Sequence, residues 1–477
     1  MSKIRGMRRY GFLASSIGVT CAAGLALVPG VLAGAAAAAA PAAPATTAGA
    51  APATGPVTGP AAVPGSTQSL PLAPRAAGRT RGRAVGAALE QGLRRADVRH
   101  FSLVGVVWDN PATELHGSVQ IRTRSAATGT WSDWQDVDTH NTDHGADPGT
   151  AERTGGHIRG ATAPLWVGDS DGVDLRVRAD TGDRTDDTAA EPPVPLPSGL
   201  RLELVDPGDT PGEDGPQTDQ PRTGDLSEAA TAASAANSGL APLGATEIPA
   251  LDRADTEREL LDLRGDELTD AQRAEPHIGA RPRIVTRRGW GADESLRSPG
   301  FVYTKKAKAA FVHHTATGNN YRCSQTPSVI RSIYRYHVKS MGWRDIGYNF
   351  LVDKCGTVYE GRAGGVAKAV LGAHTMGFNS NSVGIAVIGT YSRSKPSSAA
   401  VKAVARLAAW KLGLYGMNPR GKTYLKSGGG NLYGKGKNVH LNVISGHRDG
   451  FATDCPGRKL YAKLGTIRST AARYQGR

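Results

Sequence analysis

The chain has 477 residues and a formal net charge of +14, from 57 Lys and Arg against 43 Asp and Glu. Aromatic residues make up only 6%, whereas Gly (61) and Pro (29) are abundant. This composition excludes one compact domain that fills the chain, and it favours two folded units joined by less regular sequence.

The positive charge is concentrated in the C-terminal part of the chain. Residues 283–477 contain 32 basic and 7 acidic residues, 206–282 contain 6 and 17, and 1–205 contain 19 of each. A basic unit therefore follows an acidic segment. Such a unit attracts nucleic acid, an anionic membrane surface or an anionic wall polymer, and charge alone does not choose among them.

The first 40 residues have the organisation of a secretory signal peptide. Four basic residues, Lys3, Arg5, Arg8 and Arg9, precede an apolar stretch from 11 to about 32, and small residues follow. This order predicts export with cleavage among the alanines, so we assign 1–40 to the signal. The alternative is a retained membrane anchor, but no basic stop-transfer segment follows, and no second segment is apolar enough to span a membrane. Because an exported protein meets little chromosomal DNA, we expect no nucleic-acid partner and, after cleavage, no membrane association.

Two segments have the composition of spacers. Residues 41–97 are rich in Ala and Pro and have no periodic apolar face. Such a segment buries too little surface to offset the entropy of ordering, so we expect it to be disordered. Residues 206–282 are rich in Pro, Asp, Glu and Ala, which predicts an acidic linker with one short amphipathic helix near 254–263.

Residues 98–205 differ from the spacers on both sides. Alternating apolar and polar residues, as in 101–108 and 173–177, are separated by Gly, Asp and Asn turns. This pattern predicts an all-β, sandwich-like domain of unknown ligand. Trp131 and Trp134 in this region form either a sugar-stacking platform or, as is more common for tryptophan, part of the core.

Residues 283–477 have the pattern of an α/β domain. Apolar runs at 309–314 and 383–388 predict buried strands, and 347–360 predicts a hairpin. Three helices are expected: one beginning at Thr326 and Pro327, one spanning 397–414, and a closing helix from Leu460 to about Tyr474. A Gly- and Lys-rich loop is expected at 419–438.

The residues best suited to chemistry lie near the C-terminus. His447 and Cys455 are eight residues apart in a turn-rich segment, and His313 or His314 at a strand end offers a third ligand. Two imidazoles and a thiolate suit zinc, and three protein ligands leave the fourth position open for water. The alternative is a buried, inert cysteine beside surface histidines.

With these residues, the C-terminal part of the sequence resembles a known family, the peptidoglycan-recognition proteins and type 2 N-acetylmuramoyl-L-alanine amidases. The resemblance covers 283–477 and rests on motifs that occur in the family's order: Trp290-Gly-Ala, Phe311-Val-His-His-Thr-Ala316, Gly342-Trp-Arg-Asp-Ile-Gly-Tyr-Asn-Phe350, Tyr359-Glu-Gly-Arg362, Gly372-Ala-His-Thr-Met-Gly-Phe-Asn379, Ser382-Val-Gly-Ile385 and the 446–457 segment. It implies an α/β fold with a mixed central sheet flanked by helices. More weakly, the N-terminal region resembles that of secreted actinobacterial relatives.

The family pattern assigns His313, His447 and Cys455 as zinc ligands. His314 would then point away from the metal, because neighbouring side chains of a strand face opposite sides. Relatives that replace the ligand cysteine by serine only bind peptidoglycan, so Cys455 favours catalysis.

The resemblance also implies roles for polar residues around the metal. Tyr348 matches the tyrosine that assists catalysis, by stabilising the negative charge that develops on the substrate. Thr453 stands where phage enzymes have lysine, so we assign it only polar assistance, and no acidic residue in the motifs is an obvious proton donor. His374 and Asn379 align with residues of the substrate groove.

The resulting prediction is a secreted zinc amidase that cleaves the amide between N-acetylmuramic acid and L-alanine of peptidoglycan. We expect a monomer in the cell wall, in contact with peptidoglycan and anionic wall polymers. With Cys455 assigned to the metal, Cys323 and Cys355 remain and are expected to form a disulfide; the alternative is two unpaired thiols. The alternative functions are a peptidoglycan-binding module without activity and a wall-associated structural protein.

Overall fold

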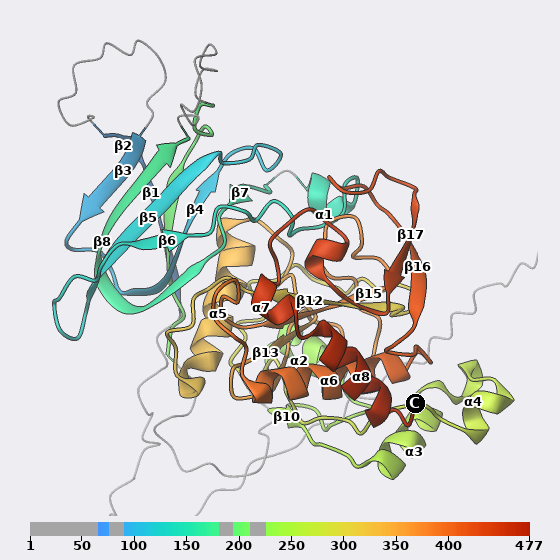
Figure 1. Cartoon of the computed structure of the whole chain (residues 1–477). Helices are drawn as coiled ribbons and strands as arrows, with labels where there is room; N and C mark the ends of the chain where they lie inside the picture. The colour runs from blue at the N-terminus through green and yellow to red at the C-terminus, as the bar shows by residue number, and fades with distance from the viewer. Residues whose placement is uncertain (1–64, 76–89, 156, 181–193, 210–225) are drawn as a thin grey trace, which may run out of the picture. The chain divides into compact units, whose positions relative to one another are not determined.

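The computed structural model describes residues 65–75, 90–155, 157–180, 194–209 and 226–477. The expected signal peptide at 1–40 lies outside these residues. The described residues belong to one compact unit, in which a β domain precedes an α/β domain (Figure 1). None of the helices in the described ranges is long and apolar enough to cross a membrane.

The β domain is built on a nine-stranded antiparallel sheet. Its strands are β1 (Ser66–Pro71), β2 (Ala73–Pro74), β3 (Glu90–Arg95), β4 (Phe101–Trp108), β5 (Gly117–Ser125), β6 (Gln135–Val137), β7 (Gly160–Ala161), β8 (Leu165–Ala179) and β9 (Arg201–Asp206). The main strand order is β1-β9-β4-β8-β3-β2, and β5 pairs with both β6 and β8. Alternating residues of β4, β5, β8 and β9 form its apolar core, which confirms the all-β expectation.

The β domain begins earlier in the chain than the predicted boundary at residue 98. The sheet begins at Ser66, which pairs with Asp206, and β3 pairs along β8, so part of the 41–97 segment is ordered. The prediction failed because β1 and β3 carry few apolar residues. Their order comes from backbone hydrogen bonds to strands more than 70 residues away in the sequence, which local patterning does not reveal.

Trp131 and Trp134 lie half-buried at the surface of the β domain. The Arg122 guanidinium lies over both rings, 5.5 and 5.1 Å from their centroids, and Arg176 lies 4.2 Å from that of Trp134. The two rings therefore pack against cations, and neither ring is part of the apolar core.

The α/β domain has a seven-stranded mixed sheet in the order β10-β11-β14-β13-β15-β12-β18. Its strands are β10 (Glu247–Ile248), β11 (Ile284–Val285), β12 (Ala309–His314), β13 (Phe350–Val352), β14 (Val358–Glu360), β15 (Ser382–Val387) and β18 (Ile444–Gly446). Strand β12 runs parallel to β15 and β18, whereas β13 and β14 form the antiparallel hairpin. This arrangement confirms the expected mixed sheet.

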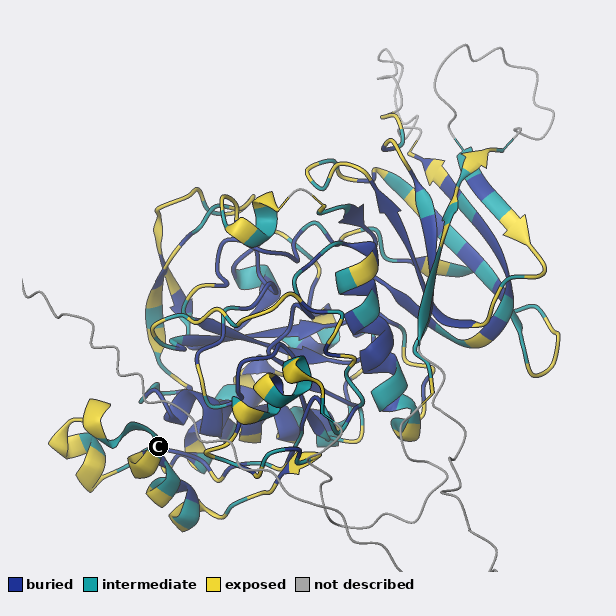
Figure 2. Cartoon of the chain, turned by 180° about the vertical axis from the view of Figure 1, so that it is seen from behind, coloured by how far each residue is buried: buried dark blue, intermediate teal, exposed yellow. Residues whose placement is uncertain are grey.

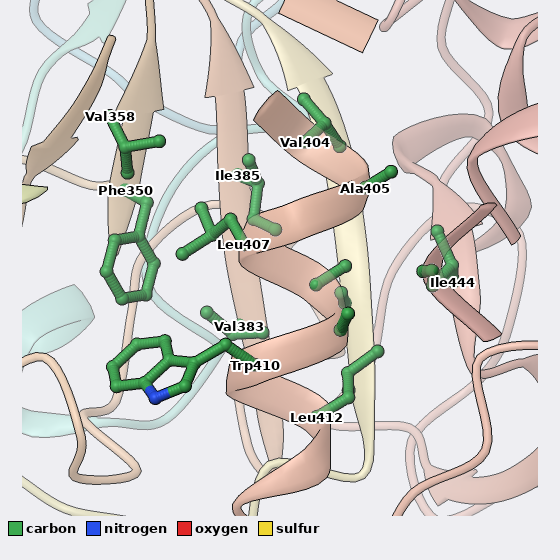
Figure 3. Close-up of a cluster of buried hydrophobic side chains, with 14 of the residues drawn as sticks. Phe350, Val358, Val383, Ile385, Val404, Ala405, Leu407, Trp410, Leu412 and Ile444 are labelled. Atoms are coloured by element: carbon green, nitrogen blue, oxygen red, sulfur yellow. The ribbon is translucent and has the colours of Figure 1, made fainter. Parts of the chain in front are cut away.

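Helices cover both faces of this sheet. Phe350, Val383 and Ile385 pack against α6 (Ser398–Gly413) on one face, which Figure 3 shows around Leu407 and Trp410. The alternate residues Leu351, Ala386 and Ile388 pack with α5 (Thr326–Arg335) on the other face. Further helical segments are η3 (Cys323–Gln325), η4 (Tyr336–Ser340), η5 (His447–Asp449), α7 (Arg458–Tyr461) and α8 (Leu464–Tyr474).

The segment 206–282 is more than a linker. Within it lie α2 (Glu228–Ala235), β10, α3 (Arg253–Arg264), η2 (Gly265–Glu267) and α4 (Asp270–Ala274). The expected helix near 254–263 is present as α3, with Asp252 as its N-cap. Figure 2 shows many exposed and half-buried residues around α3 and α4. The sequence of this segment is dominated by acidic and other polar residues, so the few apolar residues that anchor it do not form a recognisable pattern. Ile248 and Leu260 are buried in the α/β core, so these elements belong to that domain.

Two further details concern loops of the α/β domain. The expected loop at 419–438 contains β16 (Lys422–Lys426), which pairs with β17 (Asn438–Asn442). Cys323 and Cys355 form a disulfide, which ties the start of α5 to the β13–β14 turn across 32 residues. By loop-closure entropy, a crosslink of this span contributes about 3–4 kcal/mol to stability.

Candidate metal centre

Four buried side chains, His144, His313, His447 and Cys455, meet with their ligand atoms all within 4.8 Å of one another. The sheet positions two of them: Gly446 of β18 pairs with Val312 of β12, so His447 and His313 follow at the same edge of neighbouring parallel strands. Cys455 is the free cysteine of the described chain and comes from the loop after η5. The structure thus brings together the three predicted ligands and adds a fourth.

The ligand atoms of the cluster lie close enough together to face one metal ion. Cys455 Sγ lies 3.8 Å from His313 Nδ1, and the ring centroids of His313 and His144 lie 4.5 and 4.6 Å from that of His447. Bonds of ~2.3 Å to sulfur and ~2.0 Å to nitrogen place two tetrahedral ligand atoms about 3.5 Å apart. The Cys455–His313 pair is therefore within a few tenths of an ångström of this spacing, and all four donors lie within 4.8 Å of one another.

Unpaired polar atoms in this cluster also fit a metal. Both ring nitrogens of His447 and the Nε2 atom of His144 are buried without a hydrogen-bond partner. A buried polar atom without a partner costs on the order of 1–3 kcal/mol. Imidazole and thiolate are preferred zinc ligands, so the donor set fits zinc.

Burial controls the protonation of the cluster. It raises the pKa of the Cys455 thiol well above its ordinary value, and it lowers the pKa of His447 to about 3 and that of His313 well below its ordinary value. Without a cation, the Cys455 thiol and the imidazoles of His313 and His447 are therefore neutral. Metal binding must displace the thiol proton.

His144 was missed by the sequence analysis, and it comes from the β domain. Its Nδ1 atom lies 3.0 Å from Asp143 Oδ1, so a proton on Nδ1 leaves the Nε2 lone pair for the cluster. Burial alone would raise the pKa of Asp143, but the adjacent His144 and His447 lower it well below its usual range. An ionised carboxylate behind an imidazole is the common arrangement that orients a metal-binding histidine.

Tyr348 lies beside the cluster, just before β13. Its ring centroid is 5.6 Å from that of His313 and 5.7 Å from that of His144. Burial raises the pKa of the Tyr348 phenol well above its ordinary value, so its hydroxyl stays protonated and remains a hydrogen-bond donor.

Thr453 and His314 lie at the edge of the cluster. The Thr453 hydroxyl accepts a hydrogen bond of 3.1 Å from the Cys455 amide, which helps to fix the ligand loop. The His314 side chain points away from the cluster, where its Nδ1 accepts a hydrogen bond of 3.2 Å from the Tyr391 amide. This orientation follows from the alternation of side chains along β12.

The two residues predicted to line the substrate groove, His374 and Asn379, are both buried in this structure. His374 lies behind a ligand, with its Nδ1 atom 3.2 Å from His313 Nε2, and so supports that imidazole. Asn379 donates to the Gly145 carbonyl and to the Asp147 carboxylate of the β domain, at 2.8 and 2.6 Å. Sequence reasoning could not foresee this burial, because the covering residues lie more than 200 positions away.

Comparison with known proteins finds relatives of both domains. Residues 303–458 match the family described as N-acetylmuramoyl-L-alanine amidase, and residues 50–196 match the family described as Rv3811 N-terminal galactose-binding domain-like. Peptidoglycan-recognition protein SC2 of Drosophila simulans is 31% identical over 186 residues, which cover 38% of this chain and 85% of that protein. The N-acetylmuramoyl-L-alanine amidase of Homo sapiens is 33% identical over 200 residues, which cover 39% of this chain and 28% of that protein. The solved structure of wild-type Drosophila PGRP-LB aligns with 38% of this chain and 92% of its own, at 25% identity and a TM-score of 0.31.

These matches define the class as peptidoglycan amidases and peptidoglycan-recognition proteins. The chain belongs to the peptidoglycan-recognition protein family through its α/β domain, which confirms the resemblance seen in its motifs. Its β domain is galactose-binding-like.

Proposed function

We propose that this protein is an exported, zinc-dependent N-acetylmuramoyl-L-alanine amidase that acts on peptidoglycan. The observation that carries the proposal is the convergence of the buried His313, His447 and Cys455 in a domain of the amidase family, where both ring nitrogens of His447 lack a hydrogen-bond partner. The basic charge of residues 283–477 would favour contact with anionic wall polymers around the substrate.

His313, His447 and Cys455 would hold the ion. Bound zinc supplies Lewis-acid chemistry, which polarises a carbonyl and makes water nucleophilic at neutral pH. His374 holds His313 in place from behind. The thiol proton of Cys455 leaves when the metal binds, because only the thiolate is a good ligand.

The remaining polar residues would act on the substrate amide. The bond broken joins the lactyl carbonyl carbon of N-acetylmuramic acid to the nitrogen of L-alanine; the carbon gains the oxygen of water, and the amine leaves with a proton. The protonated Tyr348 hydroxyl would donate a hydrogen bond to the carbonyl oxygen as negative charge develops there. Thr453 would give only polar assistance, because an alcohol is a weak acid.

Digestion of purified peptidoglycan, with and without a chelator, tests this function. Because His144 shares the metal cluster, the full chain is compared with its His144→Ala variant, and Cys455→Ser serves as the control without the thiolate. We expect new L-alanine amino termini that disappear with chelator and in Cys455→Ser. If neither the wild type nor His144→Ala releases L-alanine termini while both bind muropeptides, the function is recognition without cleavage.

That second function has one observation in its favour. The cluster offers four protein donors to a metal ion. Sites with four protein ligands are typically structural.

A further inference from the structure

Residues 138–155, which we call the covering segment, extend from the β domain onto the metal centre. They follow β6, include Asp143 and His144, and end with α1 (Ala151–Thr154). The β domain of this chain is therefore physically part of the site that the α/β domain builds.

We propose that the covering segment keeps the enzyme latent, with His144 as the fourth zinc ligand in the position that a substrate-activating water needs. This inference rests on the proposed zinc amidase function. A catalytic zinc site has three protein ligands and one open position, whereas a closed site has four. The Nε2 atom of His144 is buried without a partner among the other donors, and Asp143 fixes the ring from the opposite nitrogen.

Backbone hydrogen bonds seat the segment on the motif that contains His374 and Asn379. The Gly145 amide donates to the Ala373 carbonyl at 3.2 Å, and the Met376 amide donates to the Asp143 carbonyl at 3.1 Å. The residues on either side of His144 are therefore paired with the α/β domain, which fixes the depth at which the imidazole enters.

Side chains of the segment extend this seat. Asp147 accepts hydrogen bonds from the Gly377 amide and from Asn379, at 2.8 and 2.6 Å. Glu152 accepts from both terminal nitrogens of Arg362 at 2.8 and 2.9 Å, and the two side chains are only 7% and 4% exposed. This ion pair is shielded from solvent and links the covering segment to the α/β domain.

The segment leaves no room for a sugar–peptide substrate. Tyr348, His447 and Cys455 are all buried beneath it or beside it. The cavity that remains beside His144 and Cys455 has a volume of about 10 Å³, which is about the space that one water molecule requires. Access therefore requires the segment to move.

X-ray absorption spectroscopy of the zinc-loaded full chain tests the proposal without any measurement of activity. We expect a first coordination sphere of one sulfur and three imidazoles in the wild type, and one sulfur, two imidazoles and an exchangeable oxygen in His144→Ala. His140→Ala is the matched control, because His140 is an exposed histidine of the same segment, and it should give the wild-type spectrum. Two imidazoles and an oxygen in the wild type would overturn the proposal.

Rates of peptidoglycan digestion give the second arm. If the open form is at most about a tenth of the population, His144→Ala increases the rate at least ~10-fold, whereas His140→Ala leaves it unchanged. A wild type as fast as His144→Ala would refute latency. If the wild-type spectrum shows three imidazoles but no variant digests peptidoglycan, His144 is the fourth zinc ligand and the proposed amidase function is wrong.

Discussion

The ion pair between Glu152 and Arg362 offers a quantitative test of how the covering segment is held. Glu152→Ala removes two charge-assisted hydrogen bonds from a guanidinium that is otherwise in contact with the carbonyls of Ile346, Leu371 and Asp345. Two such bonds are worth about 3–6 kcal/mol, and breaking a buried ion pair by removal of one partner typically costs about 3–5 kcal/mol. We therefore expect the free energy of unfolding to fall by up to about 3–5 kcal/mol.

The chain relieves part of this cost by releasing the segment, which exposes Arg362 to water. Glu152→Ala should therefore also accelerate amide hydrogen exchange across residues 141–155 more than in the α6 core. Glu275→Ala is the control, because Glu275 is exposed and surface substitutions usually change stability by less than about 0.5 kcal/mol. A Glu152→Ala variant whose unfolding and exchange match those of this control would show that the ion pair does not hold the covering segment.

Three further predictions concern the metal, the tyrosine and the disulfide. Because burial raises the pKa of Cys455 and zinc binding displaces its proton, zinc affinity should increase with pH between 6 and 8, with release of about one proton per ion. Competition with a chelating dye measures the zinc affinity at each pH, and an affinity independent of pH would contradict this prediction. Tyr348→Phe in the His144→Ala background should lower kcat by about 10²–10³-fold with unchanged zinc content, and a steady-state assay showing full activity would remove Tyr348 from the mechanism. Replacing Cys323 and Cys355 by serine should cost about 3–4 kcal/mol in denaturant unfolding, and equal midpoints for the two proteins would show that the crosslink is not stabilising.

The sequence was most informative where the physical signal is local. Apolar runs and the hairpin pattern predicted β12, β13, β14 and β15, and a His and a Cys in a turn-rich segment indicated zinc. The family resemblance assigned His313 to the metal, and alternation along β12 then implied that His314 faces the other side, because a strand exposes successive side chains on opposite faces.

Features that depend on distant contacts were not predicted. Strands β1 and β3 are ordered by partners far along the chain, and the elements of 226–282 are anchored by few apolar residues, among them Ile248 and Leu260. His144 lies 169 positions before His313, in a different domain and outside the family motifs. Its only local signal is the preceding Asp143, and a neighbouring carboxylate is too common to identify a ligand.

The proposed function and the proposed latency both depend on one zinc ion shared by His313, His447 and Cys455 and capped by His144. A crystal structure of the zinc-loaded full chain, with anomalous difference maps measured on both sides of the zinc absorption edge, would locate this ion. We expect one strong peak within about 2.0–2.3 Å of all four ligand atoms. A zinc-loaded crystal with no peak at this position, or with the ion held by other residues, would contradict it.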